Sequence, residues 1–534
     1  MSTAVAAQKY GVVARPPQAE VAREVRPAPE RYRNPIGRYK VGRSADCVSC
    51  GLCVQTCPHG VHEKPAGYRY TIRPHDQLCV GPDCAKTDHY CVAKCPKGAL
   101  SVTRNPNADV LGDPRWSSDL ILSTWYEAET GHAPKGGLEY RHGASGGGFD
   151  RIRFRFPEKV APASVPAGKD AASATAGTTP ENDIDTGLEL NRREDGRPKV
   201  HIDIPVYGGG MSFGSVSIHA ILSKARAMTA WNSFTCTGEG GFPDRLQPYD
   251  DHVITQVATG LFGVREETIQ RVRIVEFKYA QGAKPGLGGH LLGDKNTPDV
   301  ARMREAIAGN ALFSPFPFHS VYSIEDHKKH IDWIKQTNPK ALVSVKVSTP
   351  NDVDMVAVGS YHAGANIIHL DGSYGGTGAA PDIAKKNIAM PLEYAISKVH
   401  KFLVAEGIRE GIVVIASGGC RSAYDVLKAI ALGADGCVIG TAEMVAMGCT
   451  RCANCESGRG CPRGIATTDR ELIQQMSIEW ATQRLINMQN AWREQMVDVL
   501  RRLGMKSIRE LRGRTDCLYY LENECASANA EARA

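Results

Sequence analysis

The feature that most constrains the fold of this chain is a group of cysteines near its start. The group has two sets of four, each ending in a cysteine, three residues, a cysteine and a proline: Cys47, Cys50, Cys53 and Cys57, then Cys79, Cys84, Cys91 and Cys95. Short loops with this spacing present several thiolates to one centre. We therefore expect residues 41–105 to form a small α+β domain that is organised by bound metal rather than by a large apolar core.

The first set has the spacing of bacterial two-cluster ferredoxins, in which the fourth cysteine ligates the other cluster. We predict two 4Fe–4S clusters, one held by Cys47, Cys50, Cys53 and Cys95, the other by Cys79, Cys84, Cys91 and Cys57. The alternative is a pair of zinc sites with nearby histidines: His59, His62, His75 and His89. Two Cys-Pro endings in one short block favour iron.

The other cysteines and the start of the chain indicate its compartment. The chain has 17 cysteines, and its first residues lack the charged and then apolar pattern of an export signal. No apolar run approaches the ~18–20 residues that span a bilayer. We therefore expect a cytoplasmic protein without a disulfide framework. A net charge of +6 over 534 residues does not indicate nucleic-acid binding.

Two segments have the composition of loops or arms. Residues 1–40 are basic and rich in proline, which predicts an extended arm on a partner or neighbouring domain, or a disordered tail. Residues 106–200 form a connecting region. Within it, the stretch 158–186 is rich in Ala, Pro, Ser, Thr and Gly, and we expect a flexible surface loop.

From residue 201 short apolar runs alternate with helical patterns. The eight runs are 202–207, 233–237, 274–279, 311–314, 341–347, 366–370, 412–416 and 436–439. Helical patterns follow most of them, at 217–228, 326–337, 353–362, 391–406 and 422–432. This alternation predicts an α/β fold, a (β/α)8 TIM barrel over residues 201–447. A doubly wound sheet also fits, but it rarely needs eight such units in this length.

The last two predicted strands end in turns suited to a phosphate. Ser417, Gly418 and Gly419 follow the seventh strand, and Gly440 and Thr441 follow the eighth. Glycines let backbone N–H groups approach a phosphate where barrels bind one, although tight structural turns would explain either pair alone. No Gly-x-Gly-x-x-Gly follows a strand, so no nicotinamide site is expected.

A second cysteine group lies in residues 448–534, which we expect to form a cluster loop and C-terminal helices. Its members are Cys449, Cys452, Cys455 and Cys461. Thr468 and Glu471 have the spacing of a capping box that opens a long helix. Apolar residues between Leu485 and Leu503 then recur every three or four positions, which predicts packing against the barrel.

Several segments resemble the FMN-binding domain of the glutamate synthase family. They are residues 210–217, 237–241, 281–286, 345–346, 375–379, 461–467 and 513–516. The resemblance runs in order from about residue 200 to 517. With the cysteine domain in front, the chain is similar to the short, archaeal-type form, in which glutaminase and β-helix domains are separate chains.

The resemblance implies reductive amination of 2-oxoglutarate to L-glutamate by hydride from reduced FMN, with electrons relayed through clusters. The implied FMN-binding residues are Met211, Ser212, Gln281, Lys346, Gly376, Thr377, Gly378, Ser417, Gly418, Gly419, Gly440 and Thr441. The implied catalytic residues are Glu239, Lys284 and Lys346. Lys346 would place positive charge near the N1–O2 edge of the flavin, although an interior salt bridge is the alternative. Lys284 would bind a carboxylate, and Glu239 would position or protonate the imine.

For the second cysteine group the resemblance implies a 3Fe–4S cluster on Cys449, Cys455 and Cys461. Cys452 departs from the family pattern, and a fourth thiolate would allow a 4Fe–4S cluster instead. Zinc is the alternative to both.

Other departures concern the substrate. Leu261 stands where the family has arginine, and Leu287 where it has glutamate. Loss of the arginine removes a bidentate carboxylate clamp, for which Lys284, Arg265 or His290 would have to compensate. An N-methylglutamate synthase-type enzyme, or another amine and 2-oxoacid oxidoreductase, therefore stays an alternative. A flavin and iron–sulfur electron-transfer subunit of a larger complex is a second one.

The expected partners follow from the chemistry that the chain lacks. No amidotransferase sequence is present, so glutamine is not expected to be hydrolysed here. We expect separate glutaminase-type and β-helix-type subunits, and a ferredoxin or another reductase as electron donor. The expected small molecules are a 2-oxoacid and ammonia or an amine, with no nucleic acid and no membrane span.

Overall fold

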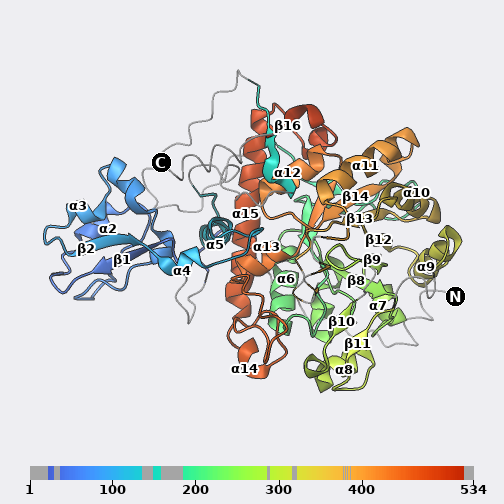
Figure 1. Cartoon of the computed structure of the whole chain (residues 1–534), viewed down its shortest axis with the longest axis horizontal. Coiled ribbons are helices and arrows are strands. Elements are labelled where there is room, and N and C mark those ends of the chain that lie inside the picture. The colour runs from blue at the N-terminus through green and yellow to red at the C-terminus, as the bar shows by residue number, and fades with distance from the viewer. Residues whose placement is uncertain are drawn as a thin grey trace.

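The computed structural model describes residues 22–28, 36–134, 148–157, 184–285, 289–315 and 321–521, except Thr377, Ala379, Asp382, Lys385 and Lys386. Most of the predicted arm and nearly all of the predicted loop 158–186 lie outside these residues. Figure 1 shows a small domain of the first strands and helices beside a large barrel, with a long helix between them. In the described part of the chain, no helix is long and apolar enough to cross a membrane.

The large domain is a closed barrel of eight parallel strands. They are β6 (Val206–Gly208), β7 (Thr235–Cys236), β8 (Val253–Ala258), β9 (Ile274–Lys278), β12 (Leu342–Ser348), β13 (Ile367–Asp371), β14 (Val413–Ser417) and β15 (Gly436–Ile439). β6 and β7 are the ends of the sheet order, and the N–H of Gly208 donates to the carbonyl of Phe234 at 2.8 Å across the gap between them. The predicted (β/α)8 barrel is confirmed, and the doubly wound alternative is excluded.

One predicted barrel strand is wrong. The run 311–314 contains β11 (Leu312–Phe313), which pairs antiparallel with β10 (His290–Leu291) outside the barrel. The third barrel strand is instead β8, which was not predicted. It follows a polar 3-10 segment, Asp244–His252, rather than an amphipathic helix, so the alternation used for the prediction is absent there.

The predicted helices around the barrel are confirmed to within a few residues. They are α6 (Ile218–Ala230), α9 (Ile324–Thr337), α10 (Val353–Ala363), α11 (Leu392–Ala405) and α12 (Ala423–Ala431). Shorter helices, α7 (Glu266–Arg271), α8 (Pro298–Arg304) and α13 (Thr441–Ala446), also occur. α8 lies in the excursion between β9 and β12, and α13 begins directly after β15.

The barrel interior is apolar at the N-terminal ends of the strands. Side chains alternate along each strand, and the first inward layer consists of Ile254, Ile274, Leu342, Ile367 and Val413. The paired strands β4 (Leu188–Glu189) and β5 (His201–Ile202) pack their apolar side chains against this layer. They close this end of the barrel, so the open end is the C-terminal one.

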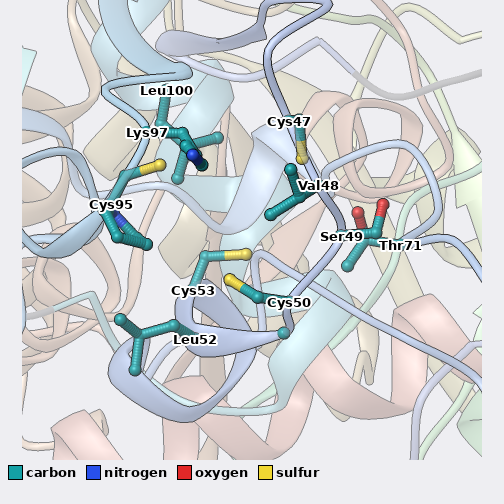
Figure 2. A pocket seen from close by; sticks show the side chains of 12 residues that line it. Cys47, Val48, Ser49, Cys50, Leu52, Cys53, Thr71, Cys95, Lys97 and Leu100 are labelled. Carbon is teal, nitrogen blue, oxygen red and sulfur yellow. The ribbon is translucent and has the colours of Figure 1, made fainter.

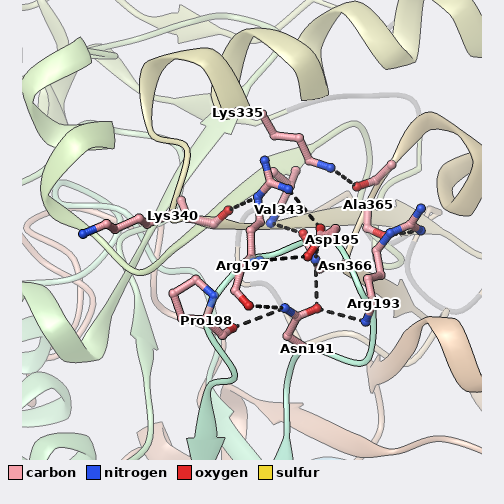
Figure 3. A network of polar contacts seen from close by, with 12 residues as sticks. Asn191, Arg193, Asp195, Arg197, Pro198, Lys335, Lys340, Val343, Ala365 and Asn366 are labelled. Atoms are coloured by element: carbon pink, nitrogen blue, oxygen red, sulfur yellow. Dashed lines mark hydrogen bonds and ion pairs between the residues drawn. The ribbon is translucent and has the colours of Figure 1, made fainter. Parts of the chain in front are cut away.

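A polar network fixes the closing segment to the strand starts, as Figure 3 shows. The side-chain amide of Asn366 donates to Asn191 Oδ1 and to Asp195 Oδ2, both at 3.1 Å. Its Oδ1 accepts from the N–H of Val343 at 3.0 Å. Arg197 donates to the carbonyl of Ala341 at 3.2 Å. Backbone groups at the starts of the strands are thus satisfied by side chains rather than by water.

Two further helices join the domains. α15 (Ile478–Arg502) packs against α6 and against α5 (Ser118–Thr130), which follows the cysteine domain. The predicted apolar stripe is confirmed as core: Leu485, Met488, Trp492, Met496 and Val499 are fully buried. The predicted capping box is wrong, because Asp469 caps the short α14 (Arg470–Ile473) and Ser477 caps α15.

The N-terminal domain is small. β1 (Tyr39–Arg43) and β2 (Leu100–Arg104) form an antiparallel pair, with α2 (Leu52–Thr56) and α3 (Cys91–Lys94) in the cysteine loops. Val41, Val61 and Leu100 form its buried apolar cluster, with most of the eight cysteines packed around them. So small a core needs bound metal or another staple for stability. That the domain carries two clusters stays a prediction.

Replacing Asn366 tests the closure of the barrel. Asn366→Ala leaves the N–H of Val343 without its buried acceptor and removes one of the two donors to Asn191 Oδ1, which costs about 2 kcal/mol of unfolding free energy. Urea unfolding measures this loss. The exposed Lys340 lies beside the same network, and Lys340→Ala is expected to change the unfolding free energy by less than about 0.5 kcal/mol. Equal unfolding curves for the two variants would contradict the assignment.

Candidate active site

A chain of polar side chains crosses the barrel interior above the apolar layer. Glu276 of β9 accepts from Gln256 Nε2 of β8 at 2.7 Å and from Ser344 Oγ of β12 at 3.1 Å. His369 Nδ1 lies 2.8 Å from Glu276 Oε2. Burial alone would raise the pKa of Glu276, but His369 and the charge of Lys346 hold it at about 2. Glu276 is therefore a fixed negative charge inside the barrel.

The same chain continues to the strand ends. His369 Nε2 hydrogen-bonds with Ser417 Oγ at 2.8 Å, and Ser417 Oγ donates to Asp371 Oδ1 at 2.5 Å. Asp371 Oδ2 accepts from the N–H of Gly282 at 2.9 Å.

Lys346 Nζ lies 3.4 Å from Asp371 Oδ2. Burial lowers the pKa of Lys346, but Asp371 and Glu276 more than reverse this, so Lys346 stays charged. The interior salt bridge considered for Lys346 is present, and it holds the ammonium at the C-terminal end of β12.

The sequence did not single out Gln256, Glu276, His369 or Asp371. A pattern that could have identified them is a polar residue at alternate positions of an otherwise apolar strand. Glu276 in β9, and His369 and Asp371 in β13, have this pattern. In a strand enclosed on both faces such residues point into the barrel and need partners.

The glycines predicted to hold a phosphate lie together at this end of the barrel. Gly418 and Gly419 have φ values of +91° and +142°, and a Cβ on Gly418 would lie 2.4 Å from the carbonyl oxygen of Gly372. A Cβ on Gly376 would lie 2.2 Å from Thr441 Oγ1, and one on Gly440 would lie 3.6 Å from Met211 Cε. The structure therefore brings Met211, Gly376, Gly440 and Thr441 together with the β14 turn. Thr377 lies outside the described residues.

We call Gly376, Gly418, Gly419, Gly440 and Thr441 the glycine cradle. Arg115, from the connecting region, adds a cation to it and was not predicted. Its guanidinium stacks on the ring of Tyr374 at 3.6 Å from the centroid. Its Nη2 lies 3.8 Å from the position of a Cβ on Gly419. Arg115 is buried, so its charge acts in a setting with little water.

A second set of charges lies beside the cradle. We call Glu239, Lys278, Lys284, His290 and Arg304 the charged set. Lys278 Nζ and Glu239 Oε2 are 3.0 Å apart, and Arg304 of α8 donates to Ser212 Oγ at 2.9 Å. Burial raises the pKa of Glu239, but Lys278, Arg304 and Lys284 together hold it below its usual value. Three buried cations thus share one carboxylate, which leaves excess positive charge for an anionic ligand. Neither Lys278 nor Arg304 was predicted from the sequence.

Lys284 has an unusual environment for a lysine. Burial, followed by the charge of Lys278, lowers its pKa to about 8. Its Nζ lies 2.7 Å from His290 Nδ1. A lysine in this state exchanges a proton near neutral pH, which suits general acid–base chemistry.

The structure decides between the cations considered as replacements for a lost arginine. The prediction that Arg265 compensates is wrong, because its Nε pairs with Glu305 at 2.9 Å on the surface. Lys284 and His290 do lie in the charged set, and Arg304 joins them. Leu261 is exposed at the end of β8 with a φ of +52°. Leu287 lies outside the described residues.

Four of the N-terminal cysteines surround one pocket. Cys47, Cys50, Cys53 and Cys95 line a space of about 370 Å³ that is partly open to solvent, and Figure 2 shows their sulfur atoms around it. These are the four side chains predicted to share the first cluster. N–H groups near Cys95, first that of Lys97 and also that of Ala99, lower the pKa of its thiol, which favours the thiolate that iron binds.

The other four cysteines of the domain also lie close together. Cys79 interacts electrostatically with Cys91, Cys57 and Cys84. Burial, with a smaller contribution from these neighbours, raises the pKa of Cys79 to about 12 and that of Cys91 to about 11. Without a bound cation these thiols stay protonated, so a metal centre is what would make them ligands.

The second cysteine group forms a loop after α13. Burial and the proximity of Cys455 and Cys461 raise the pKa of Cys449 to about 11. Cys452 is exposed and lies between Arg451 and Ala453, which both have a φ of +59°. Lys295 Nζ donates to the carbonyl of Cys455 at 2.6 Å and pairs with Glu456 at 3.0 Å. Glu456 also interacts electrostatically with Lys284 and His290, so the loop lies near the charged set.

The connecting region docks on this second cysteine loop. The N–H of Gly112 donates to the carbonyl of Thr450 at 3.2 Å, and Asp113 forms an ion pair with Arg451 at 2.6 Å. Arg451 also donates to the carbonyl of Gly376 at 3.4 Å. The connecting region, the second cysteine loop and the glycine cradle are therefore joined by direct contacts.

The side-chain spacing bears on the zinc alternative. Among the described residues, no three His, Cys, Asp or Glu side chains are close enough to hold one metal ion. Zinc binds thiolates at about 2.3 Å, so its tetrahedral ligands must be in mutual contact. In an iron–sulfur cluster each thiolate binds a different iron atom, so wider spacing is required. Which metal centre the cysteines hold stays a prediction.

Comparisons with known proteins agree with this geometry. Residues 174–506 match the model of a family described as the conserved region in glutamate synthase. The chain is 36% identical to an archaeal-type glutamate synthase (NADPH) of Thermotoga maritima over 88% of this chain and 92% of that protein. It is 36% identical to an archaeal glutamate synthase (NADPH) of Methanocaldococcus jannaschii over 90% and 94% of the two chains. The glutamate synthase (NADPH) large chain of Azospirillum brasilense is 38% identical over 58% of this chain and 21% of its own length.

Acid unfolding tests the buried charge of Glu276. Its pKa is about 2 in the folded protein and about 4.5 in the unfolded chain, so its contribution is complete above pH 4.5 and is lost as the pH falls toward 2. The contribution amounts to about 3 kcal/mol. Glu276→Gln should remove this part of the pH dependence of unfolding, followed by circular dichroism. An unchanged acid transition in the variant would show that Glu276 is not held charged.

Proposed function

The chain belongs to the family of the conserved region in glutamate synthase, and on that premise we propose that it reductively aminates 2-oxoglutarate to L-glutamate at an FMN bound in the barrel. It is a glutamate synthase-like oxidoreductase. The observation that carries the proposal is the excess of buried cations beside the glycine cradle, at the open end of the barrel. Family membership does not favour the N-methylglutamate synthase or the pure electron-transfer alternatives.

The glycine cradle fits an FMN phosphate. Side chains at Gly418 and Gly376 would collide with Gly372 and Thr441, so these positions keep the backbone available for close approach. Thr441 is the first residue of α13, and Arg115 places a cation at the rim. Backbone amides and one buried guanidinium suit a phosphate dianion.

Lys346 and Met211 would contact the flavin ring. The ion pair with Asp371 fixes the Lys346 ammonium, and a fixed charge needs no reorganisation when negative charge develops beside it. Met211 lies beside Gly440, and the next residue, Ser212, accepts a hydrogen bond from Arg304 of the charged set. When bound, FMN supplies the hydride that reduces the imine carbon.

The charged set would bind the oxoacid. 2-Oxoglutarate carries two carboxylates, and Lys278, Lys284 and Arg304 provide three cations against the one carboxylate of Glu239. Leu261 cannot clamp a substrate carboxylate, and Arg304 takes this role. Arg304 is buried beside Ser212, and two hydrogen bonds fix its guanidinium.

Lys284 would supply the proton. Imine formation releases water from the keto carbon, and reduction leaves nitrogen in need of a proton. The Lys284 ammonium holds such a proton, and its contact with His290 gives a route for replacing it. Glu239, kept ionised by its cationic neighbours, would position the substrate nitrogen.

Electrons would reach the barrel through three clusters. Two 4Fe–4S clusters fit the N-terminal domain, since each predicted set of four cysteines lies together. The third fits the loop of Cys449, Cys455 and Cys461, with the exposed Cys452 as a fourth ligand in a 4Fe–4S form and without it in a 3Fe–4S form. The ion pair of Asp113 with Arg451 would keep the connecting region fixed against the second cysteine loop.

Ammonia would come from elsewhere. The chain has no glutaminase sequence, so we propose a separate glutaminase-type subunit or free ammonium as the source, and a β-helix-type subunit beside it. The donor of electrons would be a reductase or an electron-carrying protein. The names of the related glutamate synthases include NADPH, which would be the source of the electrons.

Turnover with a chemical reductant tests the function. Anaerobically purified protein, reduced with dithionite and given 2-oxoglutarate and ammonium, should form L-glutamate, measured by chromatography. Lys284→Gln should lower the rate at least about a hundredfold and keep the flavin. Activity that needs the Lys284 ammonium should fall as pH rises above about 8. Glutamate formation that is unchanged in Lys284→Gln, or a greater rate with methylamine than with ammonium, would contradict the proposal.

Flavin retention tests the cradle. Arg115→Ala removes a buried cation worth about 2 kcal/mol to a phosphate, so FMN should bind about thirtyfold more weakly. Arg115→Lys should restore part of this affinity because it keeps the charge and loses the stack on Tyr374. Quenching of flavin fluorescence measures the dissociation constant. The exposed Arg501 provides the control Arg501→Ala. An Arg115→Ala variant that binds FMN as tightly as the control would remove Arg115 from the site.

A further inference from the structure

The N-terminal domain exposes large apolar side chains beside its first cysteine pocket. We define the cluster patch as Val48, Leu52, Tyr68 and Tyr70, whose exposed fractions are 60%, 38%, 64% and 62%. Val48 and Leu52 line the pocket with the four cysteines, as Figure 2 shows. Large apolar side chains gathered in this way usually mark a surface where another protein binds.

The two tyrosines lie in a segment whose two ends contact the pocket. They precede Thr71, which itself lines the pocket. Lys64, at the start of their loop, donates to the carbonyl of Ser49 in the first cysteine loop at 2.9 Å. The segment 64–71 is thus held against the cysteine loop. The domain projects from the barrel, so a partner can reach it (Figure 1).

The domain that carries the cluster patch has an excess of positive charge. Residues 36–105 contain ten Lys and Arg against five Asp and Glu. Lys97 lines the pocket, Lys64 holds the cysteine loop, and Arg69 stands between the two tyrosines with its guanidinium 5.6 Å from the ring of Tyr70. Of the five acids, Glu63 is paired with His75, and Asp83 and Asp88 are paired with Lys86 and Lys94. Asp46 and Asp76 accept hydrogen bonds from Ser44 Oγ and from the N–H of Val41.

We propose that the cluster patch is the docking surface for an acidic protein that carries one electron at a time. The proposal rests on the proposed function, because it supplies the electrons that the clusters pass on. A basic rim around an apolar centre steers an acidic partner and then holds it by desolvated aromatic contacts. Cys50 is exposed at the same place, which brings a partner's redox centre close to the first cluster.

The charge also argues against the most obvious other occupant. A second copy of this chain would bring another basic rim against the first, and like charges that face each other across an interface are destabilising. An acidic carrier avoids this repulsion.

Binding and electron transfer with a defined probe test the proposal. The probe is a purified acidic bacterial ferredoxin, added anaerobically to the full chain with its clusters and flavin. Calorimetry should show binding that weakens as salt is raised. The variant Arg69→Glu, and the double variant Tyr68→Ser with Tyr70→Ser, should each weaken binding about tenfold or more. They should slow reduction of the clusters by reduced ferredoxin, while reduction by dithionite keeps its rate.

Matched controls separate this surface from general effects. Lys340 and Tyr520 are exposed lysine and tyrosine residues on the barrel side, so Lys340→Glu and Tyr520→Ser should bind ferredoxin like the unchanged protein. Variants that bind normally, or controls that bind as weakly as the variants, would overturn the proposal. So would a chain that forms dimers in sedimentation and becomes monomeric in Tyr68→Ser with Tyr70→Ser.

The outcomes also distinguish this proposal from the proposed function. Glutamate formation with dithionite, together with no ferredoxin binding to the unchanged protein, would overturn the docking surface and leave the function standing. Salt-dependent ferredoxin binding that the patch variants abolish, with no glutamate formed under any reductant, would support the docking surface and contradict the function.

Discussion

The carboxylate of Asp371 is the interaction on which the open end of the barrel depends. It accepts from Ser417 at the end of β14 and from the N–H of Gly282 after β9, and it pairs with Lys346 at the end of β12. One side chain on β13 therefore fixes three neighbouring strand ends. Because Ser417 also hydrogen-bonds with His369, and His369 with Glu276, the fixed charges extend into the barrel as one network. A flavin and an oxoacid would meet groups already held in place, which is how buried electrostatics contributes most to a reaction.

The segment after the N-terminal domain has a second organising role. Within a few residues it contacts the second cysteine loop through Gly112 and Asp113 and the glycine cradle through Arg115. Electron transfer between fixed centres needs both to stay at a constant separation, and these contacts supply that constraint. They also make the cradle depend on a residue outside the barrel. Loss of this segment would therefore weaken flavin binding as well as the electron route.

The sequence predicted the site best where the chemistry requires a fixed spacing of residues along the chain. It predicted less where tertiary contacts bring distant residues together. Cysteine spacing predicted which four thiolates surround the first pocket, and glycine pairs predicted the strand ends that meet at the cradle. Strand β8 was missed because no helix precedes it, and 311–314 was placed in the barrel although it pairs with β10. Arg304 and Arg115 could not be predicted, since each reaches the site from an element far away in the sequence. Glu276 and His369 were visible only as polar residues within apolar strands.

The central claim is that one chain connects three iron–sulfur centres to a flavin. Its most direct test is the content of iron, sulfide, zinc and FMN in protein purified without oxygen. The account predicts one FMN and about eleven or twelve irons per chain, eleven if Cys449, Cys455 and Cys461 hold a 3Fe–4S cluster and twelve if Cys452 completes a 4Fe–4S cluster. Zinc in place of iron, or protein that neither contains nor takes up FMN, would contradict it.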